Sequence, residues 1–343
     1  MHEHAGIQHL NRKTTPLVVL VCFLVPSGAD LHGAASVTPR LAVQGYSPIT
    51  RTLLIANVSA DNQEKRFRLA IYDEVSGAIK GITVPGNRAW IDFAWVPGRA
   101  AFVVTDFDEG VTLFQKDTLR NAYVPTRIRC PGGVLPARCS WSPKGEWLVV
   151  NCLDKANPTR GTLWLYRFGD KALEKTDLTV DYRATTWGND GLLYATRDTE
   201  VLVAELIGGK PKVVRTVPLK GELTIFYGML GERPLYLSYD QIRVGDKIVV
   251  TMDGPGTKFR VMATQKNIFL SVSSNYLGVF NAAGLEIARS NPGRLIRLGS
   301  VKDPNTVYGL ADSSLVRLSL AEGTLKIQTV ADLEKVKQMG PDR

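Results

Sequence analysis

Short apolar runs alternate with turn-forming segments along most of the chain. Several runs are apolar at almost every position, as in LLIANV (53–58), FVVT (102–105) and LLYAT (192–196). A strand that lacks alternation between apolar and polar residues has both of its faces covered. The pattern therefore predicts an all-β chain whose sheets are covered on both sides, and helical periodicity is confined to residues 331–339.

A tryptophan followed by a turn and an apolar strand occurs three times at equal spacing. Trp95, Trp141 and Trp187 are 46 residues apart in the segments AWVPGRAAFVV, SWSPKGEWLVV and TWGNDGLLYAT. Weaker copies of the pattern are centred on Tyr46, Tyr227, Met262 and Leu298. The seven copies have a mean spacing of 42 residues, and a period of this length is the signature of a repeat array.

Each repeat has room for four short strands. In the third repeat these are 137–141, 147–152, 162–168 and 173–179. A four-stranded sheet that copies of itself cover on both faces is the blade of a β-propeller. We therefore predict a seven-bladed β-propeller of four-stranded antiparallel blades over residues 41–331, followed by a short helix or tail at 332–343.

Trp141, Ser142, Pro143, Gly145 and the strand after them resemble the TolB-type, WD40-like (PD40) propeller repeat of bacterial envelope proteins. The resemblance covers one repeat well and two in part. It implies that the aromatic residue ends the innermost strand of a blade and that the Ser-Pro-x-Gly segment forms the turn. Lys144 stands where the family usually has aspartate, so a carboxylate hydrogen bond is missing from this turn. We interpret the repeated tryptophans as packing residues between blades rather than as a ligand platform.

Residues 1–29 have the pattern of a secretory signal peptide. A basic segment precedes an apolar stretch at 17–25, and the small residues that follow predict cleavage before Asp30. Residues 30–40 would then be an N-terminal extension. The apolar stretch is much shorter than the roughly 20 residues that span a bilayer, and no later segment is long enough. We therefore expect a protein without a transmembrane segment, located in the periplasm or outside the cell.

Two other ways of processing the N-terminus remain open. Gly33 and Ala35 offer a second cleavage site. Cys22 could be the lipidated residue of a lipoprotein, but Val21 stands where a lipoprotein signal has a small residue.

Three cysteines, Cys130, Cys139 and Cys152, lie beyond the signal peptide, so an oxidising compartment permits one disulfide and leaves one thiol. If residue 141 pairs with 147 across the turn, Cys139 and Cys152 point to opposite faces of the hairpin. Cys130 lies on the preceding loop and is the freer partner. We favour the pair Cys130–Cys152, with Cys130–Cys139 as the close alternative.

The chain has a formal net charge of +9, with no continuous basic run. An exported basic protein meets acidic lipids, acidic polysaccharides and acidic proteins before it meets nucleic acid. The longest polar inserts, 59–66 and 154–161, both join the second strand of a blade to the third and should therefore emerge on one rim. Their basic residues are the candidate partner-binding residues Lys65, Arg66, Lys155 and Arg160.

Histidine chemistry is excluded from the folded body because all four histidines lie at or before position 32. This excludes Ser-His-Asp and Cys-His catalysis and histidine-based metal sites. Phosphate-binding and dinucleotide-binding glycine motifs are also missing, so no cofactor is expected. A weak calcium candidate is the cluster Asp106, Asp108 and Glu109, which is explained more simply as a polar hairpin turn.

These observations favour a non-enzymatic protein-interaction scaffold of the bacterial cell envelope. One alternative is a propeller that binds a polysaccharide or a small ligand. The other is a carboxylate-based hydrolase or lactonase that acts in the central channel. Side chains near the innermost strands that could line this channel are Tyr182, Arg183, Tyr227 and Arg260.

Overall fold

The computed structural model describes most of the chain beyond residue 39. The described residues are 40–58, 68–82, 90–106, 110–130, 132–154, 159–181, 185–221, 223–252, 257–273, 275–334 and 336.

These residues form seven antiparallel sheets, each built from four consecutive strands. Blade 1 comprises β1 (Arg40–Ser47), β2 (Thr52–Val58), β3 (Arg68–Asp73) and β4 (Ile79–Ile82). Blade 2 comprises β5 (Trp90–Trp95), β6 (Ala101–Asp106), β7 (Gly110–Asp117) and β8 (Ala122–Ile128). Blade 3 comprises β9 (Val134–Trp141), β10 (Trp147–Asp154), β11 (Arg160–Arg167) and β12 (Glu174–Asp181). Blade 4 comprises β13 (Thr185–Trp187), β14 (Leu193–Arg197), β15 (Glu200–Ile207) and β16 (Lys210–Pro218).

The remaining three blades repeat this order. Blade 5 comprises β17 (Leu223–Leu230), β18 (Arg233–Ser238), β19 (Gln241–Val244) and β20 (Lys247–Thr251). Blade 6 comprises β21 (Phe259–Ala263), β22 (Asn267–Val272), β23 (Tyr276–Asn281) and β24 (Glu286–Ser290). Blade 7 comprises β25 (Ile296–Asp303), β26 (Thr306–Ala311), β27 (Ser314–Ala321) and β28 (Thr324–Asp332).

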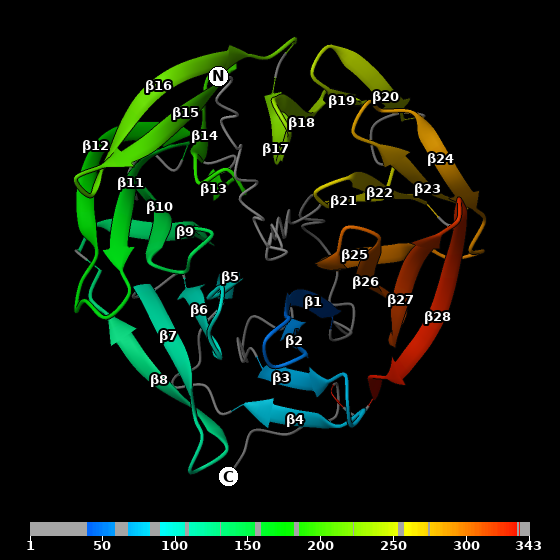
Figure 1. The fold of residues 1–343 in the computed structure, drawn as a ribbon, viewed down its shortest axis with the longest axis horizontal. Helices are drawn as coiled ribbons and strands as arrows, with labels where there is room; N and C mark the ends of the chain where they lie inside the picture. The colour runs from blue at the N-terminus through cyan, green and yellow to red at the C-terminus, as the bar shows by residue number, and fades with distance from the viewer. Residues whose placement is uncertain are drawn as a thin grey trace, which may run out of the picture.

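The sheets stand side by side in a closed ring, with the first strand of each blade innermost and the fourth outermost (Figure 1). This arrangement is a seven-bladed β-propeller, as the repeat period predicts. Every repeat anchor found in the sequence lies on an innermost strand. The anchors are Tyr46 in β1, Trp95 in β5, Trp141 in β9, Trp187 in β13, Tyr227 in β17, Met262 in β21 and Leu298 in β25.

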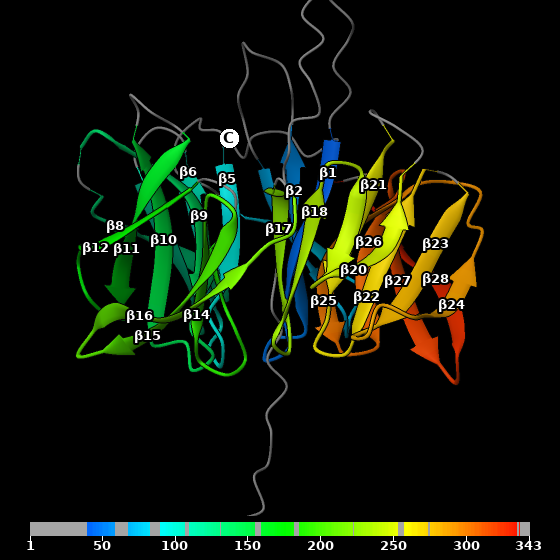
Figure 2. The same ribbon diagram turned by 90° about the horizontal axis from the view of Figure 1, so that it is seen from above.

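The ring has two faces, which differ in the connections that they carry (Figure 2). One face, here called the turn face, carries the turns between first and second strands and between third and fourth strands. The other, the connection face, carries the segments between second and third strands and those between blades. The two faces follow from the antiparallel order of the four strands, which is the same in every blade.

The apolar strands are buried because each blade packs against its two neighbours. All six residues of β6 are buried, for example. Trp141 is 5% exposed and joins side chains of blades 2 and 3 in one cluster. Trp187 belongs in the same way to the cluster between blades 3 and 4, and Trp95 is partly buried between blades 1 and 2. These positions confirm that the repeated tryptophans are interblade packing residues.

The turn after Trp141 shows how the chain reverses with lysine at position 144. The Ser142 hydroxyl accepts a hydrogen bond from the Trp147 amide at 3.0 Å. Gly145 has a φ of +67°, and a Cβ atom there would lie 2.5 Å from the carbonyl oxygen of Pro97 in blade 2. The glycine is therefore required both by the left-handed backbone and by the close approach of the neighbouring blade.

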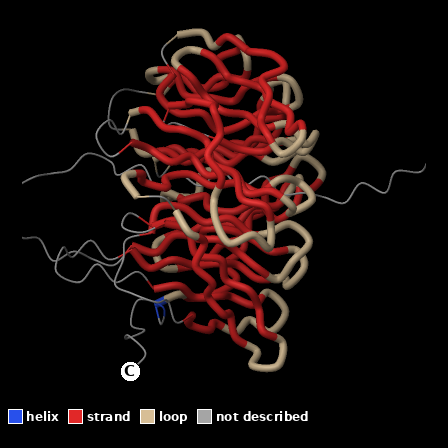
Figure 3. Tube along the Cα trace, turned by 90° about the vertical axis from the view of Figure 1, so that its left-hand side faces the viewer, coloured by secondary structure: helices blue, strands red, loops and turns tan. Residues whose placement is uncertain are grey.

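Within the described part of the chain, blades 1 and 7 exchange no strand at ring closure, because blade 1 consists of β1–β4 and blade 7 of β25–β28. Segments after β28 help to close the seam between them. Glu334 and Val336 have helical conformation (Figure 3). The side chains of Leu333 and Val336 are buried in a cluster that contains residues of both blades.

The described part of the chain contains no helix with the length and apolar character needed to cross a membrane.

Candidate functional site

The predicted partner-binding rim is only partly within the described residues. The strands that flank the two inserts are the second and third strands of blades 1 and 3, and the ends of these strands next to the inserts lie at the connection face. Lys65, Arg66 and Lys155 lie outside the described residues. Arg160 is at the start of β11, and its Nη2 atom is 3.5 Å from Oδ1 of Asp198 in blade 4. The two side chains are 65% and 70% exposed, so this ion pair contributes little to stability.

The calcium candidate is represented by one residue in the described chain. Asp106 is buried at the end of β6, and its Oδ1 atom accepts a hydrogen bond from the Gly110 amide at 3.3 Å. Asp108 and Glu109 lie outside the described residues. Among the residues described, no three His, Cys, Asp or Glu side chains are grouped to hold a metal ion. The hydrogen bond between Asp106 and the Gly110 amide is typical of a polar hairpin turn.

The channel-lining prediction is wrong for one residue. Tyr227 is 3% exposed and packs in the cluster between blades 5 and 6, so its ring does not line the channel. Arg260 is exposed, and its Nη1 atom donates a hydrogen bond to the Phe259 carbonyl at 2.8 Å. Burial raises the pKa of Tyr227 far above its usual value, and the nearby Arg260 only partly opposes this shift. Tyr182 and Arg183 lie outside the described residues.

A buried carboxylate, Asp92, lies on the innermost strand of blade 2. The side chain is 7% exposed, and its Oδ2 atom accepts a hydrogen bond from the Cys139 amide of blade 3 at 3.0 Å. Burial raises the pKa of Asp92 to about 6, against the opposing effects of Arg138 and the amides of Cys139 and Phe93. Asp92 therefore joins two blades at the inner side of the ring.

Hydroxyl groups form similar links between other blades. The Ser140 hydroxyl of blade 3 accepts from the Trp187 amide of blade 4 at 3.2 Å. The Ser271 hydroxyl of blade 6 accepts from the Ile296 amide of blade 7 at 3.3 Å. Both hydroxyl groups accept from a backbone amide of the next blade, and their role is structural.

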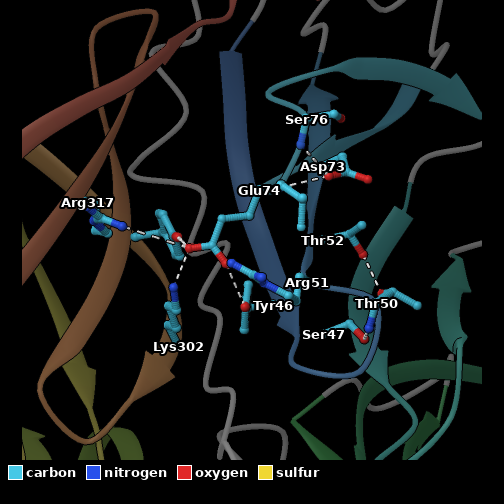
Figure 4. A network of polar contacts seen from close by, with 12 residues as sticks. Tyr46, Ser47, Thr50, Arg51, Thr52, Asp73, Glu74, Ser76, Lys302 and Arg317 are labelled. Atoms are coloured by element: carbon cyan, nitrogen blue, oxygen red, sulfur yellow. Dashed lines mark hydrogen bonds and ion pairs between the residues drawn. The ribbon is translucent and has the colours of Figure 1, made fainter.

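A network of polar contacts surrounds Glu74 at the seam between blades 1 and 7 (Figure 4). The Tyr46 hydroxyl donates to Oε2 at 2.8 Å, and the Tyr308 hydroxyl donates to Oε1 at 2.6 Å. Lys302 forms an ion pair with Oε1. Two arginines stand further away, with Arg51 Nε 3.7 Å from Oε2 and Arg317 Nη1 3.9 Å from Oε1.

Local structure places Glu74 at this point. The Oδ1 atom of Asp73 accepts hydrogen bonds from the amides of Val75 and Ser76 at 2.8 and 2.9 Å, which shapes the turn between β3 and β4. The Glu74 amide donates to the Arg51 carbonyl at 2.9 Å, which fixes this turn to the turn between β1 and β2. The Glu74 side chain therefore points from blade 1 toward Lys302 of blade 7.

The network keeps Glu74 ionised. Burial alone would raise the pKa of this carboxyl group, but hydrogen bonds from Lys302, Tyr308 and Tyr46 lower it to about 2. Burial and the bonds to Glu74 raise the pKa of both tyrosines, so they remain neutral donors. The Tyr46 and Tyr308 rings also stack, with centroids 5.9 Å apart. An ionised group held by three donors closes the ring and is poorly placed to act as a nucleophile or base.

The three cysteines all lie between blades 2 and 3, and each is in the reduced form. The parity argument from the sequence is wrong, because Trp141 pairs with Leu148 rather than with residue 147. This shift places Cys139 opposite Val150, and Cys139 and Cys152 contribute to the same apolar cluster. Cys130 interacts with Cys152, the partner favoured from the sequence, and a disulfide between them stays a prediction.

Comparison with known proteins provides a fold but no family. No family model and no curated protein matches the chain. Many solved structures are similar, among them KlHsv2 with loop 6CD replaced by a Gly-Ser linker. That structure is 13% identical, with a TM-score of 0.53, and the match covers 84% of this chain and 98% of the other. At this identity the similarity establishes the propeller fold alone.

Proposed function

We propose that this protein is an exported, non-enzymatic interaction scaffold that binds an acidic partner protein of the cell envelope through its connection face. The proposed repeat type is the TolB-like, PD40 repeat of envelope propellers. The observation that carries the proposal is that the oxygens of the buried carboxylates accept hydrogen bonds from other parts of the protein. Glu74 and Asp92 each accept hydrogen bonds across a blade interface, and Asp106 accepts one from its own hairpin.

The hydrolase alternative is less well supported. It requires two carboxylates that converge on one substrate bond with oxygens available for proton transfer or attack. The carboxylates of Glu74 and Asp92 instead serve two different blade interfaces, one at the seam and one between blades 2 and 3. Their surroundings stabilise the ring rather than a substrate.

The connection face is proposed as the binding surface because a rigid ring holds its loops in fixed relative positions. The basic residues of the inserts at 59–66 and 154–161 would supply the attraction. Exposed charge pairs are individually weak, and added salt screens them further. The affinity for the partner should therefore fall as the salt concentration rises.

The test is capture of partners from envelope extract by the purified chain, followed by mass spectrometry. The variant Lys155→Glu/Arg160→Glu should lose the captured protein. Lys210→Glu/Lys326→Glu is the matched control, because it makes the same change in net charge at exposed positions of the outer strands β16 and β28. Equal losses in the two variants would mean that net charge, and not the connection face, governs binding.

Location and chemistry are tested separately. Cleavage before Asp30 is measured by the mass of the N-terminal peptide from exported protein. Capture of an acidic polysaccharide in place of a protein would support the ligand-binding alternative, and turnover of a glycan or lactone by purified protein would overturn the non-enzymatic assignment.

A further inference from the structure

Cys130 and Cys152 are neighbours at the junction of blades 2 and 3. Cys152 lies on β10, is 1% exposed and belongs to the cluster between these blades. Cys130 follows β8, is partly exposed and packs against the same cluster. A hydrogen bond joins the two side chains. The two side chains are therefore neighbours in the fold, although 21 residues separate them in sequence.

The backbone next to Cys130 is held in place by blade 3. The Arg129 amide donates to the Lys171 carbonyl at 3.2 Å, and the Leu173 amide donates to the Arg129 carbonyl at 3.2 Å. Gly110 leaves the space that Cys130 occupies, since a Cβ atom at Gly110 would lie 2.9 Å from the Cys130 Cβ atom. The backbone bonds of Arg129 and the space at Gly110 thus hold Cys130 against the cluster that contains Cys152.

We propose that Cys130 and Cys152 are a disulfide-forming pair that is oxidised by thiol–disulfide exchange with an organic disulfide, while Cys139 remains a thiol. The Cys130 thiolate attacks one sulfur of the oxidant, and the other half of the oxidant leaves as a thiolate. The Cys152 thiolate then attacks the Cys130 sulfur and releases the second half. Two protein thiols are oxidised, the oxidant disulfide is reduced to two thiols, and these take up the two protons.

The order of the two attacks follows from accessibility. Cys130 is the partly exposed member of the pair, so the oxidant reaches it first. The hydrogen bond with Cys130 and then burial raise the pKa of the Cys152 thiol. Because the thiolate is the attacking species, the second step should be slow at neutral pH and faster as the pH rises.

Cys139 is the competitor that the test must distinguish. It lies in the same cluster, but its charged neighbours are Asp92 and Arg138. Burial, and then Asp92, raise the pKa of the Cys139 thiol well above its usual range. It is therefore a poor nucleophile at neutral pH.

The experiment uses the purified chain without a partner, so its result does not depend on the proposed function. Reduced protein is incubated with oxidised glutathione, the remaining thiols are alkylated, and the digest is mapped by mass spectrometry. We expect one cross-link, between the peptides of Cys130 and Cys152, with Cys139 alkylated. Alkylation at all three cysteines, or a cross-link that contains Cys139, would overturn the proposal.

Three variants sharpen the assignment. Cys139→Ser should form the same cross-link. Cys152→Ser should stop after the first attack and carry one glutathione on Cys130. A link between residues 130 and 152 restricts the unfolded chain, so oxidised protein should melt roughly 5 to 10 °C above reduced protein. Cys130→Ser should show no such difference, and equal melting of oxidised and reduced wild-type protein would contradict the link.

Discussion

The seam network makes a quantitative prediction for the variant Glu74→Gln. Glutamine keeps the shape of the side chain and removes the charge that Lys302, Tyr46 and Tyr308 surround. The carboxyl group has a pKa of about 2 in the folded protein, against an ordinary value of 4.5. This difference corresponds to about 3 kcal/mol of stability at neutral pH. The Glu74 side chain is 8% exposed, so solvent screening reduces this contribution only slightly.

The pH dependence follows from the direction of the shift. The folded-state pKa is depressed, so the contribution is present above pH 4.5 and is lost as the pH falls toward 2. About 2 kcal/mol of the stability gap between wild type and variant should therefore disappear between pH 6 and pH 3. The loss therefore reports the protonation of the carboxyl group.

Urea unfolding at a series of pH values measures this gap. The midpoint should be lower for Glu74→Gln at pH 6 and should approach that of wild type at pH 3, with unchanged m-values. Glu232→Gln, at an exposed position, is the control and should follow wild type at every pH. A gap that stays constant from pH 6 to pH 3 would refute the view that an ionised Glu74 closes the ring.

Three further substitutions test other parts of the ring. Trp141→Ala should lower the free energy of unfolding by about 3 to 5 kcal/mol, because it leaves a cavity in the cluster between blades 2 and 3. An unchanged melting temperature together with loss of partner binding would instead identify the tryptophan as a binding residue. Asp92 has a pKa raised to about 6, so its ionisation costs stability as the pH rises from 3.8 through 6. Asp92→Asn should remove this cost, and urea unfolding should show the variant gaining up to about 3 kcal/mol on wild type between pH 4 and pH 7. Leu333→Ala should cost about 3 kcal/mol in thermal unfolding, because the side chain is buried at the seam, and a cost near zero would mean that the segment after β28 does not help to close the ring.

The sequence was sufficient to predict the architecture because a propeller is made of local repeats. Each blade is formed by consecutive strands, so the order of apolar runs and turns along the chain is also the order in space. The spacing of Trp95, Trp141 and Trp187 reports the repeat length directly. Continuous apolar runs such as β6 report burial on both faces, which is the property that distinguishes a blade from an open sheet.

The sequence pattern could not predict the exact strand register or the contacts between residues that are distant in sequence. The pairing of Trp141 with Leu148 moved Cys139 to the face of Cys152, because a shift of one residue reverses the side on which a strand residue lies. Asp92 gave one signal, a lone acid within the apolar strand WIDFAW, but its partner in blade 3 lies 47 positions away. A local pattern cannot specify such a partner.

The seam depends most strongly on tertiary structure. Glu74 and Tyr308 are 234 positions apart and meet only because the last blade returns to the first. Repetition in the sequence determined that there would be seven similar blades and that their tryptophans would pack between them. Closure of the ring decided which charged and polar side chains would lose contact with water, and the cost of burying an unpaired charge explains why Glu74 is surrounded by Lys302, Tyr46 and Tyr308.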